Sequence, residues 1–335
     1  MPQQALDKKN LKKFVAAMLA EGRVRGPVTD VSGAVLGDIS AKSELDLGYT
    51  NFTLPPKREI FPQCEVMGTY DADGIAHEAL STEKAVIFGI RPCDAQSLEL
   101  LDRVFSDERC VDPYYHTRRS NTLIIALACG TPVETCFCMA MNGGPTGKAG
   151  ADIVATDLGE SLLFEAVSSR GQSFMKKHKD VFRAPIPKEE QKQKQQEADA
   201  QKRLSGFRIN NAPRMLAEKT DAAFWEGIAE TCLGCGACTY LCPTCHCFDL
   251  LDEKQRTGSV KMRVHDACMF ASFAREASGH NPRSNRGERM RQRIMHKFSY
   301  THENFGKIYC VGCGRCILNC PSNVDIRETL AKVTA

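Results

Sequence analysis

One short segment organises this chain, and it reads Cys232-Leu-Gly-Cys235-Gly-Ala-Cys238-Thr-Tyr-Leu-Cys242-Pro243. The same spacing of cysteines returns near the end of the sequence as Cys310-Val-Gly-Cys313-Gly-Arg-Cys316-Ile-Leu-Asn-Cys320-Pro321. In both copies a glycine stands on each side of the second cysteine, which lets the backbone fold tightly there. A proline after the fourth cysteine then directs the chain away. The two segments therefore predict two matching loops, each of which gathers several thiols.

This spacing is typical of bacterial proteins with two 4Fe-4S clusters, in which the fourth cysteine of each run ligates the cluster of the other run. We therefore predict two clusters with crossed ligation. The ligands expected for cluster 1 are Cys232, Cys235, Cys238 and Cys320. Those expected for cluster 2 are Cys310, Cys313, Cys316 and Cys242.

Disulfides and zinc are the competing uses of so many cysteines. Disulfides need an oxidising compartment, and the polar, lysine-bearing start at 1–10 lacks the apolar segment of a secretory signal. A cytoplasmic location is therefore expected. Zinc accepts CxxC pairs, but two four-cysteine runs that both end in Cys-Pro fit it poorly.

Composition indicates a protein with a sizeable core and two domains. The chain has 335 residues, 42% of them hydrophobic and 25% charged, with a net charge of +3. We expect an α/β domain over 1–178, a charged helical linker over 179–212 and a helical domain with both clusters over 213–335. No apolar stretch approaches the roughly 20 residues needed to cross a bilayer, so direct membrane insertion is not expected.

The N-terminal domain is predicted to contain a parallel pair of strands. The segments 84–90 and 121–127 are apolar and short enough to be buried strands, and 95–105 is expected to be helical. A strand, a helix and a second strand within this length predict a right-handed crossover between parallel neighbours. An amphipathic helix is also expected over 5–21.

Four further cysteines belong to this N-terminal domain. Cys93 follows the first predicted strand and Cys129 the second, with Cys136 and Cys138 a few residues later. Because parallel strands end at the same edge of a sheet, these thiols are expected to lie together. They predict a third iron-sulfur cluster, with ordinary buried thiols as the alternative. The glycine-rich stretch 142–150 is expected to pack against this site, since its spacing does not match a phosphate-binding loop.

The C-terminal domain is expected to be all-α, with the segment 262–300 interpreted as helical. Residues 261–298 hold nine Lys or Arg against three Asp or Glu. The arginines at 283, 286, 289, 291 and 293 are interpreted either as a counter-charge to the clusters or an acidic partner, or as a solvated helix face. Nucleic acid is not an expected partner because no groove-reading motif accompanies this charge. Cys245, Cys247 and Cys268 are expected to support the first cluster or the packing around it, with part of a further site as the alternative. Cys64 and Cys110 are expected to be structural thiols.

Several motifs together carry a family resemblance over roughly residues 50–330. They are Phe88-Gly-Ile-Arg-Pro-Cys-Asp94, Asp112-Pro-Tyr-Tyr115 with Arg118-Arg119, Thr135-Cys-Phe-Cys138, Cys242-Pro-Thr-Cys-His-Cys-Phe248 and the Cys310 run. The chain resembles the iron-sulfur beta subunit of cytosolic sulfhydrogenases and the corresponding iron-sulfur subunit of anaerobic sulfite reductase, and related modules accompany heterodisulfide reductase complexes. The resemblance implies partners, which are a flavin subunit that takes electrons from NAD(P)H and a separate catalytic subunit.

The sequence thus predicts an electron-transfer subunit of an oxidoreductase complex, with no substrate chemistry of its own. A 4Fe-4S cluster changes by one electron, so a series of them can join a two-electron flavin to a distant catalytic centre. Two alternatives remain. The N-terminal site could itself reduce a small sulfur substrate, or the clusters could only stabilise an adaptor.

Overall fold

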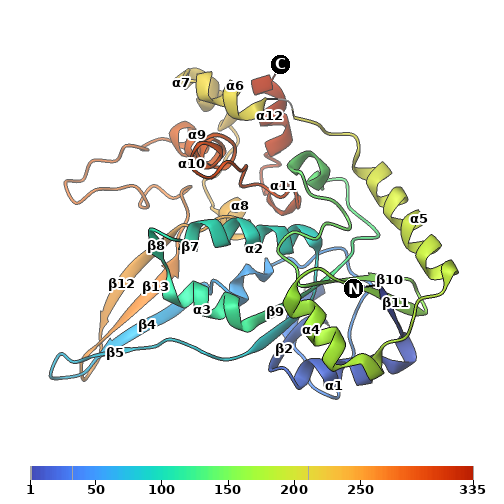
Figure 1. Cartoon of the computed structure of the whole chain (residues 1–335). Coiled ribbons are helices and arrows are strands. Elements are labelled where there is room, and N and C mark those ends of the chain that lie inside the picture. The colour runs from blue at the N-terminus through green and yellow to red at the C-terminus, as the bar shows by residue number, and fades with distance from the viewer. Residues whose placement is uncertain (1, 32, 210, 335) are drawn as a thin grey trace. The chain divides into compact units, whose positions relative to one another are not determined.

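The structure is a computed structural model that describes residues 2–31, 33–209 and 211–334. It divides into two compact units, each built from segments far apart in the sequence (Figure 1). Unit 1 contains Met1–Ile60, Ser81–Gly206 and Val311–Cys313, and unit 2 contains Phe61–Leu80, Phe207–Cys310 and Gly314–Ala335. Within the described parts of the chain, no helix is long and apolar enough to cross a membrane.

Unit 1 is built on a mixed sheet of seven strands in the order β1-β11-β10-β9-β6-β2-β3. The strands are β1 (Gln4–Asp7), β2 (Arg23–Asp30), β3 (Gly33–Asp38), β6 (Ala85–Ile90), β9 (Thr122–Leu127), β10 (Ile153–Asp157) and β11 (Ser161–Ala166). The four central strands β10, β9, β6 and β2 pair in parallel. The outer pairings, β1 with β11, β10 with β11 and β2 with β3, are antiparallel.

The helices of unit 1 cover the apolar central strands. All six residues of β9 are buried, as expected for a parallel strand covered on both faces. Helices α2 (Pro92–Phe105) and α3 (Pro113–Asn121) connect β6 to β9, and Phe14 of α1 (Leu11–Leu19) packs on Phe174 of α4 (Ser169–Lys177). Smaller elements complete the unit. They are β7 (Ser106–Asp107), β8 (Cys110–Val111) and the 3-10 turns Lys8–Asn10, Pro56–Glu59, Cys138–Met141 and Lys179–Val181.

Helix α5 (Pro187–Leu204) corresponds to the charged segment expected as a linker, and the structure groups it with unit 1. Its first turn is anchored by Glu189, which accepts hydrogen bonds from Arg183 and Ser161. Farther along, Lys192 donates to the carbonyl of Leu158 at 2.6 Å. The helix carries few apolar residues, and these hydrogen bonds attach its N-terminal half to the rest of unit 1.

Unit 2 contains a second sheet of four strands in the order β12-β13-β4-β5. The strands are β4 (Cys64–Tyr70), β5 (Ala76–Glu78), β12 (Phe248–Lys254) and β13 (Ser259–His265). Neighbouring strands are antiparallel throughout. Arg263 of β13 and Glu65 of β4 form an ion pair across the sheet, and both side chains are 1% exposed.

The remaining part of unit 2 consists of short helices and turns and contains the first cysteine run and most of the second. The helices are α6 (Ala212–Glu218), α7 (Ala222–Ile228), α8 (Ala237–Tyr240), α9 (Arg286–Met295), α10 (Thr301–Phe305), α11 (Arg315–Leu318) and α12 (Ile326–Thr334). A π-helical turn, η5 (His296–Tyr300), joins α9 to α10. The glycine before α8 and the one before α11, Gly236 and Gly314, both have left-handed backbone conformations, which glycine adopts without strain.

The predicted fold class was wrong in two respects. The expected parallel pair exists as β6 and β9, but it is only the centre of a seven-stranded mixed sheet. The C-terminal region is not all-α, because β12 and β13 lie within it and residues 266–284 form turns. In β13 the apolar residues Val260, Met262 and Val264 alternate with polar ones, which is the period of a strand. The helical interpretation instead placed Met262 at the start of a helical segment that runs to Tyr300.

Candidate iron-sulfur sites

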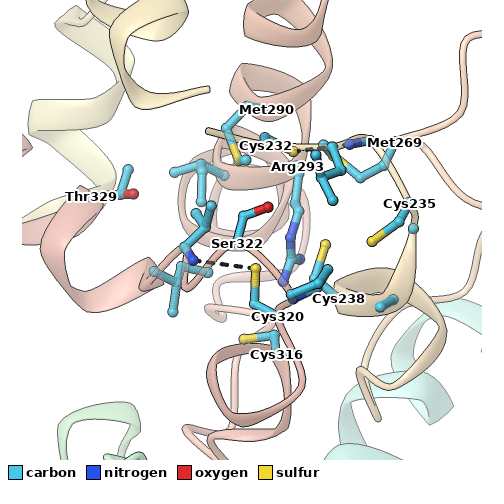
Figure 2. A pocket seen from close by; sticks show the side chains of 18 residues that line it. Cys232, Cys235, Cys238, Met269, Met290, Arg293, Cys316, Cys320, Ser322 and Thr329 are labelled. Atoms are coloured by element: carbon cyan, nitrogen blue, oxygen red, sulfur yellow. Dashed lines mark hydrogen bonds between the residues drawn. The ribbon is translucent and has the colours of Figure 1, made fainter. Parts of the chain in front are cut away.

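The first cysteine run lines a cavity in unit 2 together with the end of the second run. The lining thiols are Cys232, Cys235, Cys238, Cys316 and Cys320 (Figure 2). Apolar side chains close the cavity around them, among them Met269, Met290 and Ile294. All four ligands expected for cluster 1 are therefore brought to one cavity.

Backbone N–H groups point at two of these sulfurs. The N–H of Gly234 donates to Cys232 Sγ at 3.4 Å, and that of Val324 donates to Cys320 Sγ at 3.2 Å. Hydrogen bonds of this kind stabilise the negative charge of a thiolate. Burial raises the pKa of the Cys232 thiol, and the sulfurs of Cys238 and Cys320 raise it further. Cationic iron would offset this repulsion, since metal ligation requires deprotonated thiols.

Arg293 supplies a second sign that the cavity suits an anionic group. This arginine extends from α9 into the wall of the cavity (Figure 2) and is 4% exposed. Its Nη1 atom is buried and has no hydrogen-bond partner among the described residues. Burial alone would lower the pKa of Arg293, but the sulfurs of Cys238 and Cys316 outweigh it and raise the pKa. A buried donor of this kind fits the sulfurs of a bound 4Fe-4S cluster.

Three of the four ligands expected for cluster 2 lie in unit 2, namely Cys242, Cys310 and Cys316. Cys242 and Cys310 are buried, and Lys297 Nζ donates to Cys242 Sγ at 3.0 Å. Burial alone would lower the pKa of Lys297, but the sulfurs of Cys242 and Cys245 raise it instead. The fourth expected ligand, Cys313, is grouped with unit 1.

The four N-terminal cysteines also share a cavity, which lies wholly in unit 1. Its lining thiols are Cys93, Cys129, Cys136, Cys138 and Cys313. Cys93 lies in the first turn of α2, and Cys129 lies two residues beyond β9. The glycine-rich loop contributes Gly144 and Pro145 to the wall. The structure thus brings together the four residues expected for a third cluster, with Cys313 beside them.

The environment of this cavity raises the pKa of two of its thiols, Cys138 and Cys129. Burial raises the pKa of Cys138 to about 12, and the sulfurs of Cys136 and Cys129 add to the effect. Burial likewise raises the pKa of Cys129, although the guanidinium of Arg91 opposes the shift. Cys138 is buried and the other thiols of the cavity are partly buried, and thiolates that would repel one another there form a donor set that suits iron.

Of the remaining cysteines, Cys245 contacts an expected ligand of cluster 2, Cys247 and Cys268 contact each other, and two are exposed. Cys245 hydrogen-bonds to Cys242, and Cys268 to Cys247, and in both cases the contact raises the pKa of the thiol. Cys64 and Cys110 are exposed. Among the described residues, no three His, Cys, Asp or Glu side chains converge closely enough to hold a single metal ion.

The basic segment is not a uniformly solvated face, because Arg289 and Arg293 are buried. Arg286 donates to the carbonyl of Cys232 at 2.7 Å. Lys297, which the sequence pattern did not single out, is buried as well. The pattern held a signal for it, since positions 293 and 297 fall on the helix face defined by Met290, Ile294 and Phe298.

The family comparison agrees with this geometry. The model of the 4Fe-4S dicluster domain matches residues 231–324, which contain both cysteine runs. This part of the chain is therefore similar to 4Fe-4S dicluster domains. "Sulfhydrogenase 2 subunit beta" of Pyrococcus furiosus is 32% identical over 326 residues, which cover 96% of this chain and 95% of the relative. The chain belongs to the family of sulfhydrogenase beta subunits, as the motifs predicted, and is an iron-sulfur electron-transfer subunit.

Proposed function

We propose that this chain relays electrons inside a cytoplasmic oxidoreductase complex, between a flavin subunit that oxidises NAD(P)H and a catalytic subunit. The catalytic subunit would be of the hydrogenase, sulfite reductase or heterodisulfide reductase type. The observation that carries the proposal is the cavity in which Cys232, Cys235 and Cys238 meet Cys320 of the other run. A bound 4Fe-4S cluster supplies one-electron chemistry at such a site.

The residues of the chain would hold and insulate each cluster. Thiolates bind the iron, and the N–H groups of Gly234 and Val324 orient two of the sulfurs. Met269, Met290 and Ile294 keep water away from the cavity wall. Fixed thiolate ligands and fixed N–H donors need little rearrangement when the charge of a cluster changes by one, and this favours rapid electron transfer over substrate chemistry.

We extend the proposal to a third cluster held by Cys93, Cys129, Cys136 and Cys138. Cys313 lines the same cavity. The full chain is the sample to use, because the N–H of Phe137 donates to the carbonyl of Gly312 at 2.8 Å. Anaerobic reconstitution of Cys93→Ser or Cys129→Ser should lower the iron content by about one cluster. Unchanged iron in both variants would leave only the clusters of the dicluster domain.

The relay is tested by reducing the reconstituted chain with NAD(P)H. Reduction, followed by EPR, should require the flavin subunit that copurifies with the chain. Rapid reduction by NAD(P)H of the isolated chain, or no reduction in the complete complex, would contradict the proposal. The same copurification identifies the catalytic subunit.

A second candidate function is direct reduction of a small sulfur substrate in unit 1. It is favoured by a cavity of about 350 Å³ at the carboxyl ends of β9 and β10, with Cys129 in its wall. The guanidinium of Arg91 in its wall would attract sulfite or polysulfide anions, whereas the carboxylates of Asp157 and Glu197 would repel them. Oxidation of the photoreduced isolated chain by sulfite or polysulfide would favour this function over the relay.

A further inference from the structure

Two cationic side chains of one helical segment are buried among the cysteine sulfurs of unit 2. Arg293 and Lys297 are each 4% exposed, and they lie four residues apart on the same helix face. Removing a cation from water is costly unless negative charge compensates for it. The groups that contact Arg293 and Lys297 therefore indicate the function of these two cations.

Lys297 uses all three protons of its ammonium group at the second cysteine set. Its Nζ donates to Cys242 Sγ at 3.0 Å, to Thr244 Oγ1 at 2.8 Å and to the carbonyl of Tyr309 at 2.9 Å. Tyr309 immediately precedes Cys310. The ammonium group thus joins the backbone next to Cys310 to the sulfur of Cys242, and both cysteines are expected ligands of cluster 2.

The backbone at Lys297 is unusual. Lys297 lies in the π-helical turn η5, between the ordinary helices α9 and α10. Single π-helical turns are rare and occur frequently at functional sites, because the extra residue changes the direction of the side chains that follow. Here the carbonyl of Lys297 accepts from the N–H of Tyr309 at 2.8 Å, so the turn is fixed to the same stretch of chain that the ammonium group contacts.

Arg293 lines the cavity that holds Cys238 of one cysteine set and Cys316 of the other. The thiols that act most strongly on its charge are Cys238 and then Cys316, which belong to the expected ligands of cluster 1 and cluster 2 respectively. Its Nη1 has no hydrogen-bond partner in the described part of the chain and is a donor available to a cluster sulfur. One guanidinium group therefore faces both sites, whereas Lys297 faces one.

We propose that Lys297 and Arg293 raise the reduction potentials of the clusters. Lys297 raises the potential of cluster 2, and Arg293 raises the potentials of both clusters. The inference rests on the proposed ligation. Reduction adds one negative charge to a cluster, and a cation held nearby in a medium of low dielectric constant stabilises the reduced form. Hydrogen bonds to the cluster sulfurs act in the same direction.

EPR-monitored redox titration of the reconstituted full chain tests this inference, after the iron content has been measured. Lys297→Gln keeps a hydrogen-bond donor and removes the charge, so it should shift one cluster to lower potential and leave the other unchanged. The cluster that shifts should be the one whose signal is lost in Cys310→Ala. Arg293→Gln should shift both clusters downward, and Lys297→Arg should restore most of the original potential.

Lys307→Gln is the matched control. Lys307 lies three residues before Cys310 in sequence, but its side chain is exposed to solvent. Water screens its charge, so its loss should leave both potentials in place. Wild-type potentials in Lys297→Gln and Arg293→Gln at full iron content would overturn the inference and leave the relay intact. Failure of the wild-type chain to bind iron would instead overturn the proposed function.

If Lys297→Gln loses one cluster, Lys297→Arg decides the question. Retention of that cluster in Lys297→Arg would support the charge pairing. Loss in both variants, with unchanged potentials in Arg293→Gln, would contradict it.

Discussion

The buried ion pair between Glu65 and Arg263 joins two strands of the unit 2 sheet, β4 and β13. Strand β4 lies far from both cysteine runs in sequence. Arg263 donates to Glu65 Oε2 through Nε at 3.1 Å and again through Nη2, and its guanidinium also lies 4.9 Å from the ring centre of Phe61. Replacement of Arg263 by Met would leave the Glu65 carboxylate, 1% exposed, without its cation. Removal of one partner of such a pair costs about 3–5 kcal/mol of unfolding free energy.

Urea denaturation of the cluster-loaded chain, followed by the visible absorbance of the clusters and by circular dichroism, measures this cost. The double variant Glu65→Leu with Arg263→Met should recover most of the loss, since neither charge is then left alone. The control is Lys261→Met, which removes a partly exposed ion pair with Asp252 on the same hairpin and should cost below about 1 kcal/mol. A cost for Arg263→Met as small as that of the control would refute the argument.

Three further predictions concern other parts of the molecule. Glu189→Gln should weaken the attachment of α5 by about 1–3 kcal/mol, because it removes a carboxylate that accepts from Arg183, and limited proteolysis within 187–204 should accelerate. Burial lowers the pKa of His296 to about 4 from 6.5, so as pH falls the unfolded chain takes up this proton first and the unfolding free energy decreases. Between pH 7 and pH 5 the loss should be about 2 kcal/mol, and urea titrations of His296→Gln should show less of it than those of the exposed control His302→Gln. Anaerobic removal of iron should increase hydrogen exchange in α8, α9 and α11 far more than in β6 and β9, and equal protection before and after removal would contradict the coupling of cluster binding to folding.

The cysteine-bearing loops were readable from the sequence because their determinants are local. Spacing, glycine and proline fix each run over twelve residues, and no distant contact is needed to recognise it. The N-terminal cysteines were also brought together by a simple rule, since β6 and β9 are parallel and end at the same edge. The shared edge follows from the parallel direction of the two strands.

The rest depends on pairing between distant segments, which one sequence does not reveal. Strand β4 joins β13 across almost two hundred residues, and β1 completes the other sheet beside β11. The segment 266–284 contains Met269 and Phe270 at positions that suit a helix, yet it forms turns, and Met269 lies in the wall of the cavity of cluster 1. In these regions, contacts between distant segments determine the secondary structure and override the local sequence pattern. The buried charges of Arg293 and Lys297 were hidden for the same reason, because a basic residue in a helix is usually solvated.

The crossed ligation of the two cysteine runs is the claim on which the account depends, and EPR of reduced single variants measures it most directly. The cavity shared by Cys232 and Cys320 predicts that Cys320→Ala removes or alters the same signal as Cys232→Ala, while the signal lost in Cys310→Ala persists. Loss in Cys320→Ala of the signal that Cys310→Ala removes, with the Cys232 signal intact, would contradict the account.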